Sequence, residues 1–144
     1  MNFPFIAFES VEAAEQAFYE AMRTADLDAM MSVWADDDDI LCIHPNGHRL
    51  IGQDAIRQSW QAIFDHGAIN LRVLQPHGGG GSRFAVRSVI EEITVESLRG
   101  IQIAQCLATN IFVRHLNGWR LAVHHASPIG EPEPATRGYG EVLH

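Results

Sequence analysis

The stretch that decides the fold is residues 101–127, which read IQIAQCLATNIFVRHLNGWRLAVHHAS. Apolar and polar residues alternate through most of this stretch, and a period of two is typical of β-strands that are buried on one face. Asn117-Gly118 interrupts the alternation, and an Asn-Gly pair between two alternating runs is a strong hairpin signal. The sequence therefore predicts two long antiparallel strands, 101–115 and 119–127, joined by a tight turn.

Further segments have the composition of strands. Residues 84–98 alternate in the same way and reach the next strand through a turn at Gly100, and a shorter run covers residues 69–74. The glycine-rich residues 78–82 form a predicted loop between these two runs. Residues 40–44 and 49–51 are expected to pair as a short hairpin around a Pro-Asn-Gly turn. The sequence thus predicts a small hairpin and, after a helix, a long meander.

The first part of the chain has helical periodicity. Apolar residues recur at helical spacing from Ser10, a predicted N-cap, to about Ala25, and again from Asp26 to Trp34. A third amphipathic helix is predicted over residues 54–65. Helices that precede a run of strands indicate an α+β domain, in which three N-terminal helices pack on one face of a strongly curved, mixed but mainly antiparallel sheet.

Length and composition limit the function classes. The 144 residues fit a single domain, 1–144, with a core from about 10 to 127 and an extended tail over 128–144. The net charge is −8 and the ten basic residues are scattered arginines, so no nucleic-acid-binding face is predicted. No apolar run is long enough to span a membrane. Two cysteines and the lack of a signal-peptide pattern predict a cytoplasmic protein.

These segments, taken in order, resemble the SnoaL-like branch of the nuclear transport factor 2-like superfamily. The resemblance covers about residues 11–127 and rests mainly on Trp34-Ala35-Asp36-Asp37, Ile43-His44-Pro45-Asn46-Gly47, Gly118-Trp119-Arg120 and His124-His125-Ala126-Ser127. It implies a cystatin-like cone, a bent sheet around helices with a pocket at one end. The superfamily includes steroid isomerases, polyketide cyclases, dehydratases and the association domain of a calcium/calmodulin-dependent kinase, so the fold does not fix the chemistry.

His44 is the predicted catalytic residue. In the ketosteroid isomerases the base is an aspartate directly before a proline in the strand after the second helix, and His44 stands in that position, before Pro45. An imidazole can accept a proton near neutral pH. The isomerases also have a tyrosine on the first helix. Tyr19 is its one counterpart, but the sequence does not fix its register, so Tyr19 is not among the predicted site residues.

Ligand-binding roles are also predicted for two tryptophans and an amide. Trp34 and Trp60 are expected to form aromatic pocket walls with His44, and the indole N–H of Trp60 suits a pocket rim. Asn110 is an amide among apolar neighbours on a strand, where it needs a hydrogen-bonding partner. In an enzyme, Asn110 or Trp60 would hold an oxyanion.

The neighbouring histidines at 124 and 125 must point to opposite faces of one strand. His124 is favoured as the pocket residue, since His125 keeps phase with residues that form a packed face. No metal is predicted, although a cross-strand cluster of His44 with either histidine remains an alternative. The chain has no lysine, which excludes a Schiff base and a Walker-type phosphate loop, and no cofactor is predicted.

Two functional hypotheses follow. The first is a domain that binds a small, largely apolar organic molecule, with cofactor-independent isomerase, cyclase or dehydratase chemistry at His44 as one form of it. The second is a non-catalytic dimerisation or association module. Both predict a homodimer, because the outer face of the late strands is too apolar to be exposed to water. A pocket that is open supports the first, and one filled by Trp34, Trp60 and Phe64 supports the second.

Overall fold

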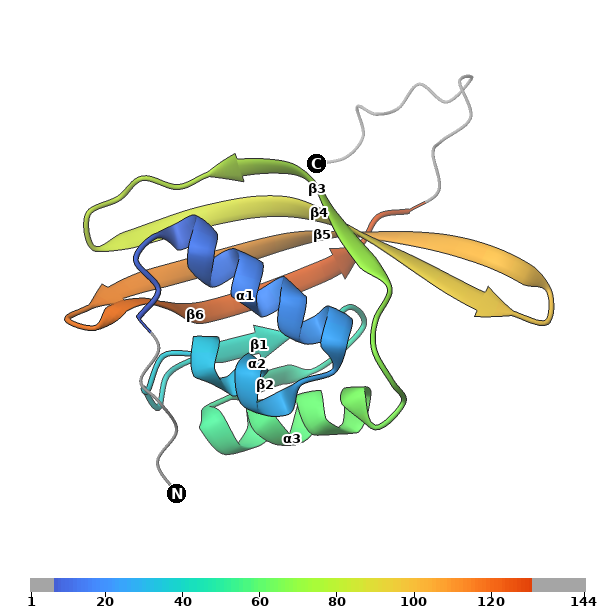
Figure 1. The fold of residues 1–144 in the computed structure, drawn as a ribbon, viewed down its shortest axis with the longest axis horizontal. Coiled ribbons are helices and arrows are strands. Elements are labelled where there is room, and N and C mark those ends of the chain that lie inside the picture. The colour runs from blue at the N-terminus through green and yellow to red at the C-terminus, as the bar shows by residue number, and fades with distance from the viewer. Residues whose placement is uncertain (1–6, 131–144) are drawn as a thin grey trace.

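The computed structural model describes residues 7–130, so the predicted tail beyond residue 130 lies outside the described residues. Within these residues, three helices and six strands form one layered domain (Figure 1). In chain order they are α1 (Val11–Thr24), α2 (Leu27–Val33), β1 (Leu41–Ile43), β2 (Arg49–Ile51), α3 (Gln53–Phe64), β3 (Leu71–Gly78), β4 (Phe84–Ser97), β5 (Gly100–His115) and β6 (Gly118–Pro128).

The helix starts follow the capping residues expected from the sequence. The Ser10 hydroxyl accepts a hydrogen bond of 3.0 Å from the backbone N–H of Ala13, and the Asp26 carboxylate accepts one of 3.0 Å from Ala29. These side chains satisfy backbone donors that the first helical turn leaves free. The predicted starts of α1 and α2 are therefore confirmed.

The sheet has the strand order β2-β1-β6-β5-β4-β3. β1 runs parallel to β6 and every other neighbouring pair is antiparallel, which confirms a mixed, mainly antiparallel sheet in an α+β domain. The three helices lie on one side of this sheet (Figure 1). At one end of the sheet, residues 94–104 of β4 and β5 extend past the remaining strands as a two-stranded arm (Figure 1).

β3 differs from the strand that the sequence predicts. β3 begins at Leu71 and continues to Gly78, whereas the alternation predicted residues 69–74. The strand passes an irregularity at Gln75, where φ is +48°, and its pairing resumes at His77 opposite Ser88. β3 therefore extends to the edge of the glycine-rich segment that the sequence predicted to be a loop.

A bulge in β6 changes which residues face the helices. Ile111 pairs with Val123 and Phe112 pairs with Leu121, so Ala122 is the extra residue. As a result, Leu121 and His124 are both buried, although an odd and an even position of a regular strand would face opposite sides of the sheet. The sequence-based phase argument, which grouped His125 with Leu121, is wrong across this bulge.

The space between helices and sheet is filled by large side chains, and Phe18, Trp60 and Phe112 are each no more than 1% exposed. On the opposite face of the sheet, β4 and β5 present a row of exposed apolar residues to solvent. The exposed residues of this outer face are Phe84, Val86, Ile101, Ile103 and Leu107. Within residues 7–130, no helix has the length and apolar character needed to cross a membrane.

Candidate functional site

A cluster of polar side chains is buried between α1 and the sheet. Each of its members is at most 9% exposed, which is unusual for ionisable groups and calls for hydrogen-bonding partners. The cluster consists of Glu15 and Tyr19 from α1, Arg87 and Glu91 from β4, Asn110 from β5, and His124 from β6.

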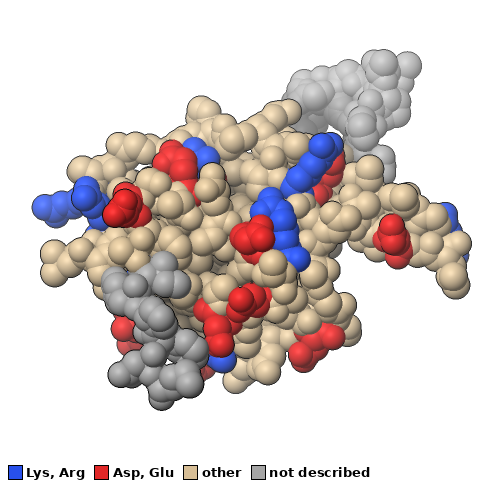
Figure 2. Space-filling view, in the orientation of Figure 1, with Lys and Arg blue, Asp and Glu red and all other residues tan. Residues whose placement is uncertain are grey.

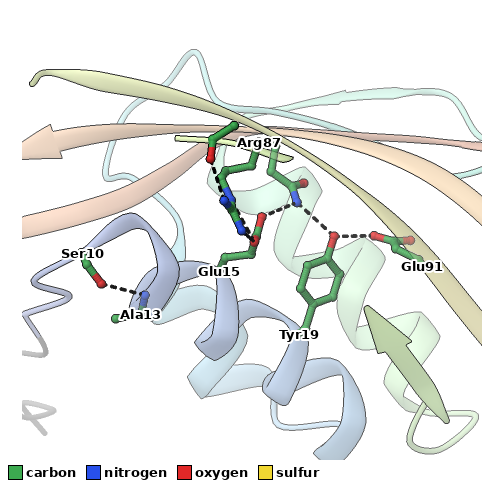
Figure 3. Close-up of polar contacts among 8 residues, drawn as sticks. Ser10, Ala13, Glu15, Tyr19, Arg87 and Glu91 are labelled. Carbon is green, nitrogen blue, oxygen red and sulfur yellow. Dashed lines mark hydrogen bonds and ion pairs between the residues drawn. The ribbon is translucent and has the colours of Figure 1, made fainter. Parts of the chain in front are cut away.

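One part of the cluster is a directed chain of hydrogen bonds. The Tyr19 hydroxyl donates to Glu91 Oε2 at 2.7 Å and accepts from Asn110 Nδ2 at 3.0 Å (Figure 3). The Oδ1 atom of Asn110 lies 2.6 Å from His124 Nδ1. Because this oxygen can only accept, Nδ1 of His124 carries the proton, and its Nε2 is left unprotonated in the neutral ring.

The other part of the cluster is an ion pair. Arg87 donates to Glu15 Oε1 from both Nε and Nη2, at 3.1 and 2.8 Å, and from Nη1 to the Gly78 carbonyl at 2.7 Å (Figure 3). Asn110 Nδ2 lies 3.4 Å from Glu15 Oε2 and links the pair to the chain. A buried ion pair is tolerated when its remaining hydrogen-bonding groups are satisfied, as they are here.

In the part of the chain that the structure describes, no arginine forms a salt bridge with the buried Glu91 carboxyl. Burial raises its pKa from 4.5 to about 7, the Tyr19 hydrogen bond partly opposes this rise, and the Glu15 charge adds to it. Burial also raises the pKa of Tyr19 well above its usual 10, and the Glu91 charge acts in the same direction. Tyr19 therefore stays protonated, and Glu91 titrates near neutral pH.

His124 is the neutral member of the cluster. Its ring lies 4.9 Å from that of Phe18, and its Nε2 is 3.8 Å from Glu91 Oε2. Burial lowers its pKa from 6.5 to about 3, and electrostatic interaction with the nearby His44 and His125 acts in the same direction. At neutral pH, His124 thus acts as a hydrogen-bond donor to Asn110 and carries no charge.

The ion-pair side of the cluster borders a cavity of about 210 Å³ between α1 and β3, which we call the α1–β3 cavity. Glu15, Tyr19 and Arg87 form its buried wall, and the charged residues nearer to solvent come from the two ends of α1. The lining residues are Glu12, Glu15, Gln16, Tyr19, Arg23, Val73, Pro76 and Arg87.

Two of the sequence-predicted ligand-binding residues, Asn110 and His124, lie in the polar cluster. The two tryptophans occupy different positions. Trp60 is 1% exposed and its ring lies against those of Phe18 and Phe64, so it belongs to the core and is not at a pocket rim. Its indole N–H has no hydrogen-bond partner among the described residues, contrary to the expectation that the N–H would find one at a rim.

Trp34 is not among the residues that line the α1–β3 cavity. It is buried after α2, bridges to Leu121, and borders a separate cavity of about 450 Å³. The Asp36, His115 and Asn117 side chains around that cavity are exposed, whereas Arg120, which also lines it, is buried. The structure therefore does not bring Trp34 together with Asn110 and His124 in one cavity.

His44 is half-buried at the end of β1, outside the polar cluster. Its Nε2 is 2.7 Å from the Ser59 hydroxyl and 3.7 Å from Cys42 Sγ, and its ring meets that of Trp60 edge-on at 4.8 Å. Burial lowers the pKa of His44, so the ring is neutral at pH 7 and has the protonation state of a base. His44 is not among the residues that line the α1–β3 cavity.

Among residues 7–130, no group of three or more His, Cys, Asp or Glu side chains has a geometry that could hold a metal ion. The buried thiol of Cys42 also has its pKa raised to about 12, first by burial and then by the Glu91 charge, which makes it a poor ligand and nucleophile.

Sequence reasoning missed Glu15, Arg87 and Glu91, and it left Tyr19 unassigned. A signal was present in β4, because Arg87 and Glu91 lie two residues before and after the buried Val89 and therefore on the same face of the strand. Charged residues on the buried face of a strand need partners, and this pattern could have indicated a polar cluster. Which residues supply the partners depends on how α1 lies across the sheet.

The helix order, the mixed sheet and its packing define an α+β domain of the cystatin-like, nuclear transport factor 2-like class. The sequence profile of the SnoaL-like domain family matches residues 11–131. The chain therefore belongs to the SnoaL-like domain family, as the sequence motifs indicated.

Two solved structures show this likeness. One, from Thiobacillus denitrificans, is named as a candidate calcium/calmodulin-dependent protein kinase type II association domain; it is 38% identical, has a TM-score of 0.79, and the match covers 87% of this chain and 99% of that one. Another, from Streptomyces avermitilis, is named as a candidate dehydratase of the NTF2-like family; it is 27% identical with a TM-score of 0.76, over 85% and 95% of the two chains.

A curated relative comes from a plant. The F-box protein SKIP8 of Arabidopsis thaliana is 27% identical over 117 residues, which are 76% of this chain and 46% of that protein. The chain thus spans about half the length of this curated relative. Relatives with one shared domain therefore carry different names, which agrees with a fold that hosts several functions.

Proposed function

We propose that this domain binds a small polar molecule in the α1–β3 cavity. The observation that carries the proposal is the buried wall formed by Glu15, Tyr19 and Arg87, which borders the cavity and is held in place by the rest of the cluster. Side chains locked by hydrogen bonds present their remaining donors and acceptors in fixed positions, which favours binding by preorganisation. Tyr19, whose pKa is raised by burial, is one of the lining residues, and a perturbed ionisable group beside a cavity is typical of functional sites.

This proposal changes the ligand that the sequence suggested. A largely apolar molecule was expected in a pocket walled by Trp34, His44 and Trp60, but Phe18 and Trp60 fill the space beside His124. Of the two functional hypotheses, a filled space there favours the association module. The α1–β3 cavity has charged walls, and these suit a polar ligand. The hypothesis that His44 acts as a base stays a prediction, to be tested by activity of His44→Ala on an identified substrate.

Native mass spectrometry of freshly purified protein tests the proposal. We expect the wild type to retain a small molecule that the cavity-filling variant Val73→Phe has lost, because Val73 lines the cavity. Val95→Phe, which changes an exposed valine on the arm, is the matched control and should retain it. Retention by Val73→Phe at the wild-type level would place the ligand elsewhere.

A second function, self-association, is supported by the outer face of β4 and β5. This face carries a row of exposed apolar residues, which a second copy of the chain would cover, and apolar patches of this kind mark interaction sites. The match to the structure named for a kinase association domain covers 87% of this chain and 99% of that one. We therefore also propose that the domain forms a homodimer through this face.

Light scattering coupled to size-exclusion chromatography tests the dimer. Leu107→Glu places a charge in the middle of the outer face and should shift the protein to the monomer mass. Leu116→Glu changes a more exposed leucine in the β5–β6 turn, away from this face, and should not change the mass. A wild-type protein that runs as a monomer at high micromolar concentration would contradict the proposal.

A further inference from the structure

The two-stranded arm, residues 94–104, has an open edge along β5. The Ile129 N–H donates to the Gln105 carbonyl at 2.9 Å, and in the described part of the chain no strand lies beside β5 on this side before Gln105. Alternate residues of an antiparallel ladder direct their N–H and C=O groups to the same side. The backbone groups of Ile103 and Ile101, two and four positions before Gln105, therefore point away from the arm without a neighbouring strand.

The composition of this edge favours pairing with another strand. Proteins commonly block an open edge with charged residues or proline, but residues 100–104 read GIQIA and contain neither. The opposite edge of the arm differs, since the Thr94 N–H already donates to the Asn70 carbonyl and the next outward-pointing residue is the charged Glu96. In Figure 2, uncharged side chains make up most of the visible surface of the arm. The β5 edge is therefore the one that is open to a partner.

A second copy of this edge fits the first. When Ile101 of one copy lies opposite Ile103 of the other, the reverse pair forms as well, because antiparallel pairing of identical strands has a two-fold axis, here at Gln102. Both isoleucine pairs are then hydrogen-bonded pairs, and each exchanges both of its N–H···O=C bonds. The two Gln102 residues form the non-hydrogen-bonded pair between them. This register satisfies the outward-pointing backbone groups of both copies.

The side chains also suit this register. Ile101 and Ile103 are 67% and 62% exposed, and both lie on the outer face of the arm. Pairing of two arms brings the isoleucines of both copies into one apolar cluster. Thr94 and Glu96 pair with these isoleucines inside each arm and border the cluster. An apolar centre with a polar rim is typical of protein interfaces.

The tip of the arm meets a hollow in the second copy. Leu98 is fully exposed, and in this register it comes opposite Cys106 of the other chain. A cavity of about 520 Å³ lies there, lined by residues 103–106 and 128–130 and by the β1–β2 turn. Because Ile129 occupies the position beside Gln105, an incoming tip has to leave the plane of the sheet at this point, and the cavity offers room for its leucine.

The charges beside this hollow are complementary. Arg99 follows Leu98 in the tip, and in the same register it approaches Gln105 of the second copy. The Gln105 amide donates to Glu92 Oε2 at 2.9 Å, so the arginine arrives beside a carboxylate. Opposite charges at the rim of an interface favour one register over others, and they reduce the repulsion between two chains with a net charge of −8.

We propose that two copies of this chain pair edge to edge through their arms, with the two-fold axis at Gln102. The contact involves residues 98–104 of each copy, fewer than the roughly 20–30 residues per side of a standard interface, so it is weak by itself. It uses the backbone edge of β5 and not the outer face that carries the proposed homodimer. A subunit can use both surfaces, and the arms then join such dimers into larger assemblies.

Disulfide trapping in the full chain tests this pairing. Gln102→Cys places two thiols opposite each other in a non-hydrogen-bonded pair, where the Cα atoms are about 4.5 Å apart, a separation that a disulfide spans. We expect this variant to shift to the mass of a covalent dimer under oxidised glutathione. Peptide mapping distinguishes this disulfide from one at the buried Cys42 or Cys106.

Ser97→Cys is the matched control for trapping. Ser97 is exposed on the same arm but lies on β4, so two copies of it are about 14 Å apart across three strand spacings. This variant should stay at the monomer mass. Gln102 also pairs with Val95 on the inner side of the sheet, so a dimer formed through the outer face does not bring two Gln102 side chains together.

Two proline variants test the hydrogen bonds of the edge. Ile103→Pro, added to Gln102→Cys, removes an N–H that points away from the arm and should abolish the covalent dimer. Glu96→Pro removes the outward-pointing N–H of the opposite edge and should leave the covalent dimer unchanged. Proline is tolerated where the N–H of an edge strand faces outward, so the β4–β5 ladder persists in both variants.

Three results would overturn the inference. Gln102→Cys might form no more covalent dimer than Ser97→Cys, or Ile103→Pro could leave trapping at the same level. Both results would contradict the edge pairing and leave the proposed outer-face dimer intact. Loss of trapping when Leu107→Glu is added would show that the arms do not pair independently of the outer face. Trapping that persists in Leu107→Glu supports the edge contact even if light scattering finds no outer-face dimer.

Discussion

Tyr19 donates a buried 2.7 Å hydrogen bond to Glu91, and Glu15 binds Arg87 with the same separation of 72 residues. Glu15 and Tyr19 are one helical turn apart, about 6 Å along the axis of α1, whereas Arg87 and Glu91 are about 13 Å apart along β4. The long side chains of arginine and glutamate compensate for this difference by converging on the helix. A single helix face and a single strand face thus join in two polar contacts.

The Glu91 carboxyl should make stability depend on pH. Its pKa rises from 4.5 to about 7 on folding, so its stabilisation is complete below pH 4.5 and is lost as the pH rises through about 7. The shift corresponds to about 3 kcal/mol. Glu91→Gln keeps an acceptor for Tyr19 without a charge, so its stability relative to wild type should increase by a few kcal/mol between pH 5 and 8. Urea unfolding at each pH measures this, and a constant difference between the two proteins would contradict it.

His124 should produce the opposite dependence on pH. Its pKa falls from 6.5 to about 3 on folding, so its contribution is complete above pH 6.5 and is lost as the pH falls toward 3. Each pH unit in this range corresponds to at most about 1.4 kcal/mol. His124→Asn retains a donor for Asn110. As the pH falls from 6.5 to 4.5, the free energy of unfolding of this variant should decrease by about 2 kcal/mol less than that of the wild type. Parallel stability curves for the two proteins would show that His124 does not titrate as its burial requires.

Removal of one partner of the Arg87–Glu15 pair should be costly. Arg87→Met leaves the Glu15 carboxylate buried without its cation, and the loss of one member of a buried pair costs about 3–5 kcal/mol. The double variant Glu15→Gln with Arg87→Met should recover part of this loss, because no buried charge remains. A double-mutant cycle by chemical denaturation gives the coupling, and strictly additive losses would mean that the pair does not act as a unit.

Alanine substitutions at two glycines distinguish the cost of backbone strain from the cost of a steric clash. Gly118 and Gly100 have φ values of +109° and +104°, a region that disfavours other residues. A Cβ at Gly118 would lie 2.7 Å from the Phe8 carbonyl oxygen, whereas nothing lies within 4 Å of one at Gly100. Gly118→Ala should therefore destabilise the protein more than Gly100→Ala, by about 1 kcal/mol or more. Thermal unfolding of both variants measures the difference, and equal losses would show that Phe8 moves away freely.

Much of the fold could be predicted because its signals are local. Ser10 and Asp26 act as helix caps within three residues, and the turn at Leu116-Asn117, which ends at Gly118, closes within four. The alternation of β4 and β5 likewise indicates two faces. The end of β3 could not be predicted, because the positive φ at Gln75 and the resumed pairing at His77 depend on contacts with β4.

The candidate site was predictable only in part. Asn110 is conspicuous among apolar neighbours, and the structure gives it three buried partners. His124 is the buried member of the histidine pair, but it does not line the α1–β3 cavity, so its role as a pocket residue stays a prediction, and the bulge at Ala122 makes the phase argument behind that choice unsound. The roles expected of Trp34 and Trp60 depend on whether space remains beside them, which no local pattern reveals.

By itself, the sequence determined the helices, the turns and the two faces of each long strand, because caps, turn residues and periodicity act over a few positions. Only the tertiary structure decided which polar side chains meet. Glu91 is an inward-facing carboxyl in any alternating strand, but its partner Tyr19 comes from a helix 72 residues earlier. The packing of α1 across the sheet sets that contact, and the bulge in β6 sets which histidine joins it.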